Sequence, residues 1–270
     1  MSILQKLDQL IAQLNQYQNL SIAISGGIDS MLLCYVAHAY SSAKVLAVHA
    51  ASPAVPKAAF ERVERFAREQ NWPLKIIDAN EFSDPDYLKN PANRCYFCKS
   101  NLYSRVASVS VGAIASGTNM DDLSDYRPGL KAATENKVVH PYVDAQLKKS
   151  DIYALAEHLN IKDLERLPAQ PCLASRVETG LNIVAEDLSF IDHCETQVRQ
   201  FLPNIADVRT RMTHSGVYVE LSELPPQQIL SQLSQLIKQI CQSNDYLFAG
   251  VRLYQKGSAF LTEDKFYAAV

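Results

Sequence analysis

The first part of the chain alternates short apolar runs with longer amphipathic stretches. Apolar runs bounded by turn-forming residues predict buried strands at residues 20–24, 44–49, 74–78 and 111–116. Apolar positions at helical spacing predict helices at residues 3–14, 29–40, 57–70, 98–108 and 147–159. Strands that alternate with helices are typical of a parallel sheet with helices on both faces, so the pattern predicts an α/β fold.

The pattern changes after about residue 183. A helix, two strands, a helix and a strand are expected in turn at residues 186–201, 207–212, 216–221, 227–241 and 246–253. This order does not continue the alternation, and it predicts a smaller α+β unit. We place a boundary near Gly180, which gives a first domain of residues 1–180 and a second of residues 181–270. No flexible linker marks it, so we expect the two domains to pack together.

Residues 25–30 read Ser-Gly-Gly-Ile-Asp-Ser, between a predicted strand and a predicted helix. Gly26 and Gly27 permit a tight turn that exposes backbone N–H groups, and the following helix directs its positive end to the same place. Ser25 and Ser30 add hydroxyl donors, and Asp29 can hold a Mg²⁺ that offsets phosphate charge. A Gly-Gly turn without a ligand is the alternative, but the whole string in this context favours nucleotide binding. It is not a Walker loop, because no Gly-Lys-Ser/Thr is present.

Composition excludes some classes of partner. The chain has 270 residues, a formal net charge of −3 and a pI near 6.1, so its surface has no general attraction for nucleic acid. No apolar run is long enough to span a membrane, and the N-terminus resembles an amphipathic helix more than a signal peptide. We therefore expect a cytoplasmic protein whose six cysteines are reduced.

Two cysteines form the pattern Cys95-x-x-Cys98. A redox pair would be expected at the first turn after an early strand, whereas this pair follows a long loop. A zinc site needs four ligands, and the chain has no second Cys-x-x-Cys. Three cysteines can instead hold a [4Fe–4S] cluster with one open iron, and Cys172 is the one further cysteine in a comparable loop. Three roles for these cysteines stay open at this point: ligands of an iron–sulfur cluster, ligands of zinc, or structural thiols. Cys34, Cys194 and Cys241 lie on predicted helices among apolar residues, and we expect them in the core.

The loop at residues 167–181 contains Cys172, Arg176 and two prolines. A nearby guanidinium can favour the thiolate form of a cysteine, and a thiolate can bind metal or attack an activated carboxyl group. A buried small residue in a proline-rich loop is the alternative.

Residues 117–131 form the most polar stretch of the chain, and residues 117–130 are predicted to be a loop at the carboxyl end of a strand. Ligands bind at such strand ends in open α/β sheets. Carboxylates such as Asp121 can position Mg²⁺, and cations can meet phosphate or carboxylate. The candidate ligand-binding residues here are Gly117, Asn119, Asp121, Arg127 and Lys131. A solvated loop with aspartates as caps is the alternative.

Arg209 and Arg211 alternate along one predicted strand, so they lie on one face of it. A pair of guanidinium groups suits a phosphate, and a solvated edge strand is the alternative.

With these motifs in place, the chain resembles the LarE family of ATP-dependent sulfurtransferases within the ATP-pyrophosphatase superfamily. The matching segments are residues 25–30, 94–99 with Tyr103, 117–131, 172–176 and 208–211. The resemblance implies that ATP adenylates a substrate carboxylate, that pyrophosphate leaves, and that sulfur then displaces AMP. The implied substrate is pyridinium-3,5-biscarboxylic acid mononucleotide, a precursor of a nickel-pincer cofactor. A homo-oligomer is also implied. With this resemblance, we expect residues 1–180 to be the ATP-pyrophosphatase domain and residues 181–270 to be the domain for substrate binding and sulfur transfer.

The resemblance also implies roles for individual residues. In one branch of the family the residue matching Cys172 donates its own sulfur. In the other branch, the residues matching Cys95, Cys98 and Cys172 hold a [4Fe–4S] cluster that carries an extra sulfide. All three cysteines are present, so we expect the cluster branch. Arg209 and Arg211 match arginines near the substrate phosphate, and Arg176 and Glu195 match positions of the same pocket.

One segment departs from the family. The family's last strand usually continues into an acidic segment, but residues 251–257 contain no acid here. An AMP-forming amide ligase, a tRNA thiolase and a nucleotide-binding regulator are the competing functions. The acidic pI and the absence of a recognisable RNA module count against the thiolase.

Overall fold

A computed structural model describes residues 1–124, 128–168 and 170–255. The chain divides into two compact units. The first contains Met1–Asp84 and Asn93–Gln170, and the second contains Pro85–Ala92 and Pro171–Val270. Residues 171–180, which the sequence assigned to the first domain, and the short segment before Asn93 therefore group with the second unit.

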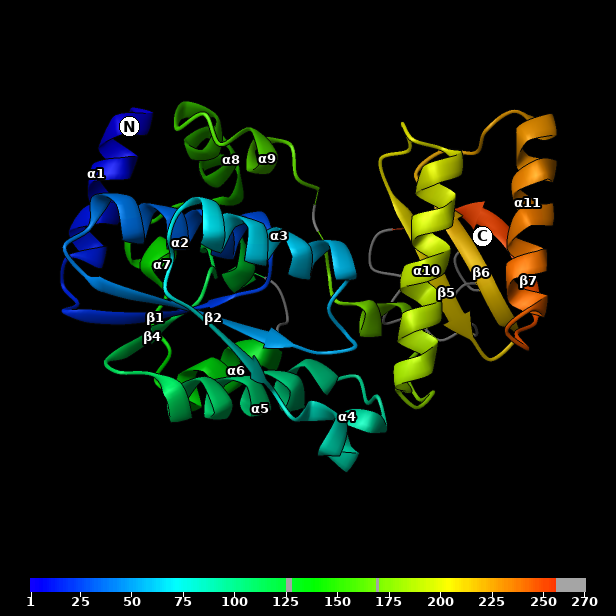
Figure 1. Cartoon of the computed structure of the whole chain (residues 1–270), viewed down its shortest axis with the longest axis horizontal. Coiled ribbons are helices and arrows are strands. Elements are labelled where there is room, and N and C mark those ends of the chain that lie inside the picture. Colours follow the sequence, from blue (N-terminus) through cyan, green and yellow to red (C-terminus); the bar gives the residue numbers. More distant parts are fainter. Residues whose placement is uncertain (125–127, 169, 256–270) are drawn as a thin grey trace. The chain divides into compact units, whose positions relative to one another are not determined.

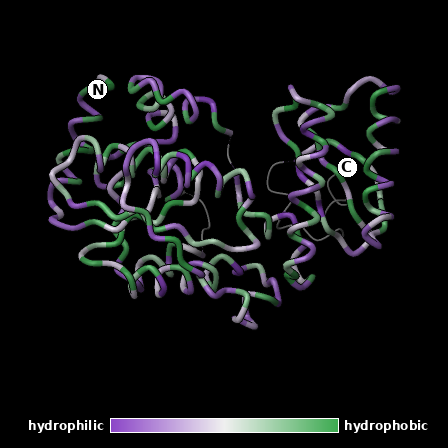
Figure 2. Tube along the Cα trace, in the orientation of Figure 1, coloured by the Kyte–Doolittle hydropathy of each residue, from purple (hydrophilic) through white to green (hydrophobic). Residues whose placement is uncertain are grey.

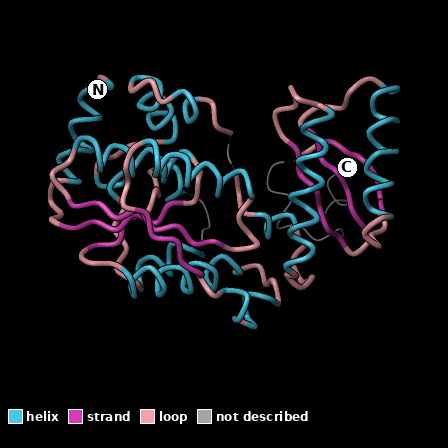
Figure 3. Tube along the Cα trace, in the orientation of Figure 1, coloured by secondary structure: helices cyan, strands magenta, loops and turns pink. Residues whose placement is uncertain are grey.

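The first unit has a parallel sheet of four strands in the order β3-β2-β1-β4. The strands are β1 (Asn19–Ile24), β2 (Lys44–Ala51), β3 (Leu74–Asp78) and β4 (Ala113–Ala115). β1 is central and pairs with β2 from Asn19↔Lys44 to Ile24↔His49. The predicted α/β fold is confirmed, and all four of its strands were located from the apolar runs (Figure 3).

Helices cover both faces of this sheet (Figure 1). One face carries α1 (Ile3–Leu14), α2 (Ile28–Tyr40), α3 (Lys57–Glu69), α7 (Pro141–Asp144), α8 (Lys149–His158) and α9 (Lys162–Glu165), and the other carries α5 (Arg94–Val109) and α6 (Pro128–Glu135). The larger of two apolar clusters lies under the first group and includes Leu10, Leu32 and Leu155, all fully buried. The smaller cluster joins Val48 and Ile114 of the sheet to Val106 of α5. Burial on both faces explains why these strands read as continuous apolar runs.

The second unit has a three-stranded sheet in the order β5-β6-β7. β5 (Val208–Thr213) pairs antiparallel with β6 (Gly216–Leu221), and β6 pairs parallel with β7 (Phe248–Leu253). The unit also contains α4 (Pro85–Leu88), α10 (Ala185–Phe201) and α11 (Gln227–Gln242). Side chains such as Ile191, Val219 and Ile237 are fully buried between helices and sheet. The predicted smaller α+β unit is thereby confirmed as a mixed sheet with helices.

Two predicted boundaries were wrong. α5 begins at Arg94, four residues before the predicted start, so Cys95 and Cys98 both lie in its first turns. Residues 117–130 were predicted as a loop, but a 3₁₀ turn covers Met120–Ser124 and α6 begins at Pro128. Polar and turn-forming residues obscured both starts, because aspartate, serine and proline are as common at helix ends as in loops.

The helices of both units mix hydrophobic and hydrophilic positions (Figure 2). In the part of the chain that the structure describes, no helix combines the length and apolar character needed to cross a membrane.

Candidate active site

The 25–30 loop connects the central strand β1 to helix α2 and is closed by its own serines. Ser30 Oγ accepts a hydrogen bond from Ser25 N at 3.0 Å and donates one to Gly27 O at 3.2 Å. α2 begins at Ile28 behind Gly27, which has no side chain to cap it. The backbone N–H groups of this helix start therefore suit an anion.

Close approaches of backbone explain two of the glycines. Gly26 has φ +80°, and a Cβ placed on it would lie 2.5 Å from Ala59 O of α3. A Cβ on Gly117, which follows β4, would lie 2.7 Å from Ser30 N. β2 and β4 flank β1, so the elements that follow them approach the loop from its two sides.

Asp29 is the focus of polar contacts on the β4 side of the loop. Lys149 Nζ lies 2.5 Å from Asp29 Oδ2, and Asn119 Nδ2 donates to Asp29 Oδ1 at 3.3 Å. The hydroxyl of Tyr142 donates to Asp29 O at 3.0 Å. The structure thus brings together Asp29, Asn119 and Gly117, which the sequence analysis named as candidate ligand-binding residues, and adds Lys149. Sequence reasoning missed Lys149 because it appears only as one of two lysines before a helix.

The remaining predicted residues of the 117–131 stretch have different roles or places. Asp121 Oδ2 accepts from Lys149 N at 2.9 Å, so this carboxylate caps the start of α8. Lys131 is exposed on α6, 3.9 Å from Glu135, and its ammonium lies 5.4 Å from the centre of the Tyr96 ring. Arg127 lies outside the described residues. The ligand roles of Asp121, Lys131 and Arg127 stay predictions.

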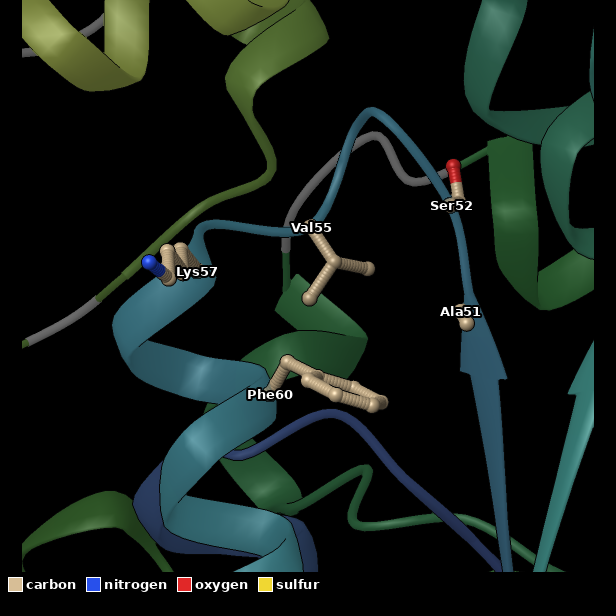
Figure 4. Close-up of a pocket in the computed structure, with 5 residues that line it drawn as sticks. All are labelled: Ala51, Ser52, Val55, Lys57 and Phe60. Carbon is tan, nitrogen blue, oxygen red and sulfur yellow. The ribbon is translucent and has the colours of Figure 1, made fainter.

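A pocket of about 210 Å³ opens at the end of β2, beside α3 (Figure 4). Its lining residues are Ala51, Ser52, Val55, Lys57 and Phe60. In Figure 4 the Phe60 ring and the Val55 side chain supply apolar walls. The Ser52 hydroxyl donates to the buried carboxylate of Glu81, which fixes the turn that forms this wall. Sequence reasoning did not identify this pocket, because its residues carry no motif.

Arg62 of α3 also contacts the 25–30 loop. Its Nη1 donates to Gly26 O at 2.6 Å and to Gln170 Oε1 at 3.1 Å. The guanidinium thereby fixes the direction of a loop carbonyl. Nothing in the sequence connected this residue to the loop.

Cys95 and Cys98 are half-buried, and their spacing places both side chains on one side of α5. Two thiols one helical turn apart are a suitable pair of ligands for a single metal centre. Among the residues that the structure describes, no three His, Cys, Asp or Glu side chains are grouped as metal ligands. Cys172 belongs to the second unit, so the role of the three cysteines together stays a prediction. Cys34, Cys194 and Cys241 are fully buried, which confirms their assignment to the core.

In the second unit, Cys172 is exposed and directly precedes the 3₁₀ turn Leu173–Arg176. The Arg176 guanidinium holds this turn, because its Nη1 donates to Pro171 O at 2.7 Å and to Cys172 O at 3.3 Å. Its other side forms a bidentate pair with Glu195 of α10, at 2.9 and 3.1 Å. Arg176 and Glu195 were predicted to share a pocket, and the structure brings them together. The contact from Arg176 to the Cys172 residue is to its carbonyl.

The sheet of the second unit holds a row of charged side chains. Arg209 and Arg211 are 5% and 7% exposed, so the solvated-edge alternative is wrong. Arg209 pairs with Asp207 at 3.0 Å, and Arg211 pairs with Glu220 at 2.8 Å. Burial, and then the neighbouring Arg176, lower the pKa of Arg209. A compact group of buried guanidiniums of this kind can bind an anionic substrate.

Glu220, which sequence reasoning missed, connects two arginines of this row. It is 1% exposed and accepts from Arg211 with Oε2 and from Arg252 with Oε1, the latter at 3.1 Å. Arg252 lies on β7 opposite Glu220, and its guanidinium carbon is 4.2 Å from the centre of the Tyr218 ring. β7 begins the segment, residues 251–257, that contains no acid. In this segment Arg252 binds the buried carboxylate of Glu220.

No family model matches the chain. It is 32% identical to the uncharacterized protein slr1717 of Synechocystis over 263 residues, which cover 93% of this chain and 96% of the relative. The chain belongs to the family of the slr1717 protein. It is also 29% identical over 252 residues to the uncharacterized protein MJ0830 of Methanocaldococcus jannaschii, with 91% and 93% of the two chains covered.

One relative of this slr1717-family chain has a named activity. The chain is 27% identical over 219 residues to the pyridinium-3,5-bisthiocarboxylic acid mononucleotide synthase of Lactiplantibacillus plantarum, with 79% of this chain and 78% of the relative covered. This similarity supports the resemblance to the LarE family that the motifs indicated.

Proposed function

We propose that this slr1717-family chain is an ATP-dependent sulfurtransferase that adenylates a substrate carboxylate and then replaces AMP by sulfur. The observation that carries the proposal is the 25–30 loop, closed by Ser25 and Ser30 and placed at the start of α2. The similarity to the bisthiocarboxylic acid mononucleotide synthase supports a related acid as substrate. Pyridinium-3,5-biscarboxylic acid mononucleotide is accordingly the first substrate to test.

The first unit offers a place for each part of ATP. The pocket at the end of β2 has the apolar walls that a purine base needs, and the adjacent 25–30 loop has the backbone donors that phosphates need. Mg²⁺ prefers oxygen ligands and usually shares them with substrate phosphates. Asp29 fits this use, because its carboxylate is 29% exposed and Lys149 beside it can move to a phosphate oxygen.

The activation step balances without a further reagent. An oxygen of the substrate carboxylate attacks the α-phosphorus of ATP, the bond to the bridging oxygen breaks, and pyrophosphate leaves. Lys149 and the loop N–H groups would stabilise the negative charge on the departing pyrophosphate. A sulfur nucleophile then attacks the carbonyl carbon of the acyl adenylate, and AMP leaves with the former carboxylate oxygen.

Sulfur delivery is assigned to the cysteines. Cys95 and Cys98 would hold a [4Fe–4S] cluster together with Cys172. Such a cluster, when bound, supplies an iron site that can hold sulfide. The chain's own contribution is to present two thiols from one side of α5 and to fix the main chain of Cys172 through Arg176.

The second unit would bind the acid itself. Arg209 and Arg211 would meet its phosphate, since guanidiniums bind phosphate oxygens in pairs. Arg176 and Glu195 would keep these arginines and the Cys172 turn in place, because both lie beside β5: Glu195 Oε1 also accepts from Thr210 N at 3.0 Å.

A second candidate source of sulfur is Cys172 itself. Its exposure favours this alternative, because a sacrificed sulfur must reach the substrate. Anaerobic purification distinguishes the two. Iron and acid-labile sulfide that disappear in Cys98→Ala support the cluster, whereas loss of the elements of H₂S from Cys172 after one turnover supports the sacrificial cysteine.

The proposed function is tested by supplying ATP, Mg²⁺, sulfide and the biscarboxylic acid mononucleotide. We expect AMP and pyrophosphate in equal amounts and an acid in which sulfur has replaced oxygen, detected by mass spectrometry. An amide ligase would require ammonia instead of sulfide and would be unaffected by Cys172→Ala. Absence of pyrophosphate with this acid and with related pyridine acids would contradict the proposal.

A further inference from the structure

Arg62 lies on α3, contacts the 25–30 loop, and shares this helix with Phe60, which lines the pocket at the end of β2. It follows Ala59 by three residues, which is about one turn, so it lies on the side of α3 where Ala59 approaches Gly26. If the pocket binds the base of a nucleotide and the 25–30 loop binds its phosphates, Arg62 is close to the phosphates.

The hydrogen bonds of Arg62 leave one edge of its guanidinium unused. Both bonds come from Nη1, and both acceptors are neutral: the Gly26 carbonyl and the Gln170 side-chain amide oxygen. Among the described residues, neither Nε nor Nη2 of Arg62 has an acceptor, and no carboxylate lies within ion-pair distance. Nε and Nη2 form the edge of a guanidinium that binds two oxygens of one phosphate or carboxylate.

The neighbouring arginine on the same helix shows the contrast. Arg65 forms an ion pair with Asp163 at 2.7 Å, with both side chains about half exposed. Arg62 is half-buried. Burial and then the charge of Arg65 lower its pKa, and the charge of Asp163 opposes this effect. Asp163 is already paired with Arg65, and Arg62 forms no ion pair among the described residues, so a bound anion would offset further the cost of holding this half-buried cation.

We propose that Arg62 binds a phosphate oxygen of the nucleotide through its Nε–Nη2 edge, while Nη1 fixes the Gly26 carbonyl. The inference rests on the proposed function, because it takes ATP as the ligand of the 25–30 loop. It adds a guanidinium to a loop whose own sequence has no cation.

This oxygen can belong to the α-phosphate or to the β- and γ-phosphates, which end in different products of the reaction. The α-phosphate stays with AMP, and the β- and γ-phosphates leave as pyrophosphate. AMP and inorganic pyrophosphate, each with Mg²⁺, are therefore the two probes.

The test uses calorimetric titration of the full chain and of three variants. Arg62→Gln removes the charge and keeps a side-chain donor for Gly26 O, and Arg62→Lys keeps the charge without the bidentate edge. Arg65→Gln is the matched control on the next turn. Loss of a charge-assisted hydrogen bond corresponds to about a tenfold to hundredfold weaker binding. We expect this loss for AMP or for pyrophosphate in Arg62→Gln, a smaller loss in Arg62→Lys, and none in Arg65→Gln.

The outcomes are distinguishable. If Arg62→Gln binds AMP and pyrophosphate as tightly as the wild type does and melts at the same temperature, the role of Arg62 is overturned and the proposed function stays intact. A wild-type chain that binds neither probe and releases no pyrophosphate would overturn the proposed function and this inference with it. If Arg62→Gln does not fold, wild-type affinity for both probes in Arg62→Lys would overturn the inference.

Discussion

Gly26 and Gly27 are adjacent in the 25–30 loop but are needed for different reasons. Gly26 has a left-handed backbone and touches the Ala59 carbonyl, whereas Gly27 has φ −80° and only the Ser25 hydroxyl near the position of a Cβ. The motif alone does not separate these roles, since both glycines can serve a tight turn. The structure separates them, and the difference can be measured.

Gly26→Ala is expected to lower the free energy of unfolding by about 1–3 kcal/mol, because it combines an unfavourable backbone conformation with a clash at 2.5 Å. Gly27→Ala should cost about 1 kcal/mol or less. Alanine is a poorer N-cap than glycine, but the φ of −80° suits any residue and a Cβ would lie 3.5 Å from Ser25 Oγ. Urea unfolding of both variants checks this. Equal losses would contradict the assigned roles.

The pair of Arg176 and Glu195 gives a second prediction at the residue scale. Their side chains are 3% and 11% exposed, so Glu195→Ala leaves a buried guanidinium without its carboxylate. Removal of one member of a buried pair costs about 3–5 kcal/mol, and we expect the lower end of this range in urea unfolding. Asp207→Ala is the control, because Asp207 is 35% exposed and its pair with Arg209 should be worth no more than about 1 kcal/mol. If Glu195→Ala leaves the free energy of unfolding unchanged, the pair of Arg176 and Glu195 does not stabilise this region.

Residues of the site divide into those with and without a local signal. Asp29 and Asn119 could be predicted, because each follows the carboxyl end of an apolar strand by a few residues. Arg62 and Lys149 could not, since each reaches the loop from a helix that is distant in sequence. A charged residue on an amphipathic helix looks the same whether it faces solvent or a loop. Three-dimensional packing alone decides between the two.

At the scale of elements, the central strands are joined by a buried histidine. His49 of β2 is fully buried, and its Nδ1 donates to Ile24 O at the end of β1, at 2.8 Å. Its Nε2 has no hydrogen-bond partner in the described residues. Burial lowers the pKa of His49, and the Ile24 carbonyl and then the charge of Glu64 oppose this effect. The lowered pKa favours the neutral ring at the base of the 25–30 loop.

This lowered pKa predicts a loss of stability on acidification. Above the unfolded-state value of about 6.5 both states are neutral, and below it the unfolded histidine gains a proton that the folded one resists. Stability should therefore fall as the pH drops below about 6.5 and continue to fall toward the folded-state pKa. In His49→Asn, which keeps a donor for Ile24 O, the difference in unfolding free energy between about pH 7.5 and about pH 5.5 should shrink. His140, whose pKa burial also lowers, keeps part of the dependence. An unchanged difference would contradict the assignment.

The elements themselves were mostly predictable where burial was uniform. β1 and β2 are apolar on both faces, and the apolar runs predicted them directly. The predicted start of α5 was too late, because the residues at its true start, Asn93 and Arg94, are polar and give no apolar signal. The earlier start of α5 matters for metal binding, because it places Cys95 and Cys98 on one side of a helix.

At the scale of the whole molecule, the sequence correctly indicated two architectures. It could not show that residues 85–92 group with the second unit, because that grouping depends on distant contacts such as the Asn90 amide donating to Glu178 O at 2.8 Å. The predicted homo-oligomer and the role of 181–270 as a substrate domain stay predictions.

The division into two units also predicts separable activities. Cys172→Ala alters the second unit and leaves the 25–30 loop of the first unchanged. We expect this variant to release pyrophosphate from ATP in the presence of the acid, at a reduced overall turnover, and to form no thiocarboxylate. A pyrophosphate assay and mass spectrometry of the product check it. Thiocarboxylate formation at the wild-type rate would remove Cys172 from the mechanism.

The central claim is that ATP activates a carboxylate before sulfur replaces AMP. The most direct measurement uses substrate acid labelled with ¹⁸O in its carboxyl groups, incubated with ATP, Mg²⁺ and sulfide. We expect one ¹⁸O in each AMP formed during thiocarboxylate synthesis and none in pyrophosphate. Unlabelled AMP, or label in inorganic phosphate beside ADP, would contradict it.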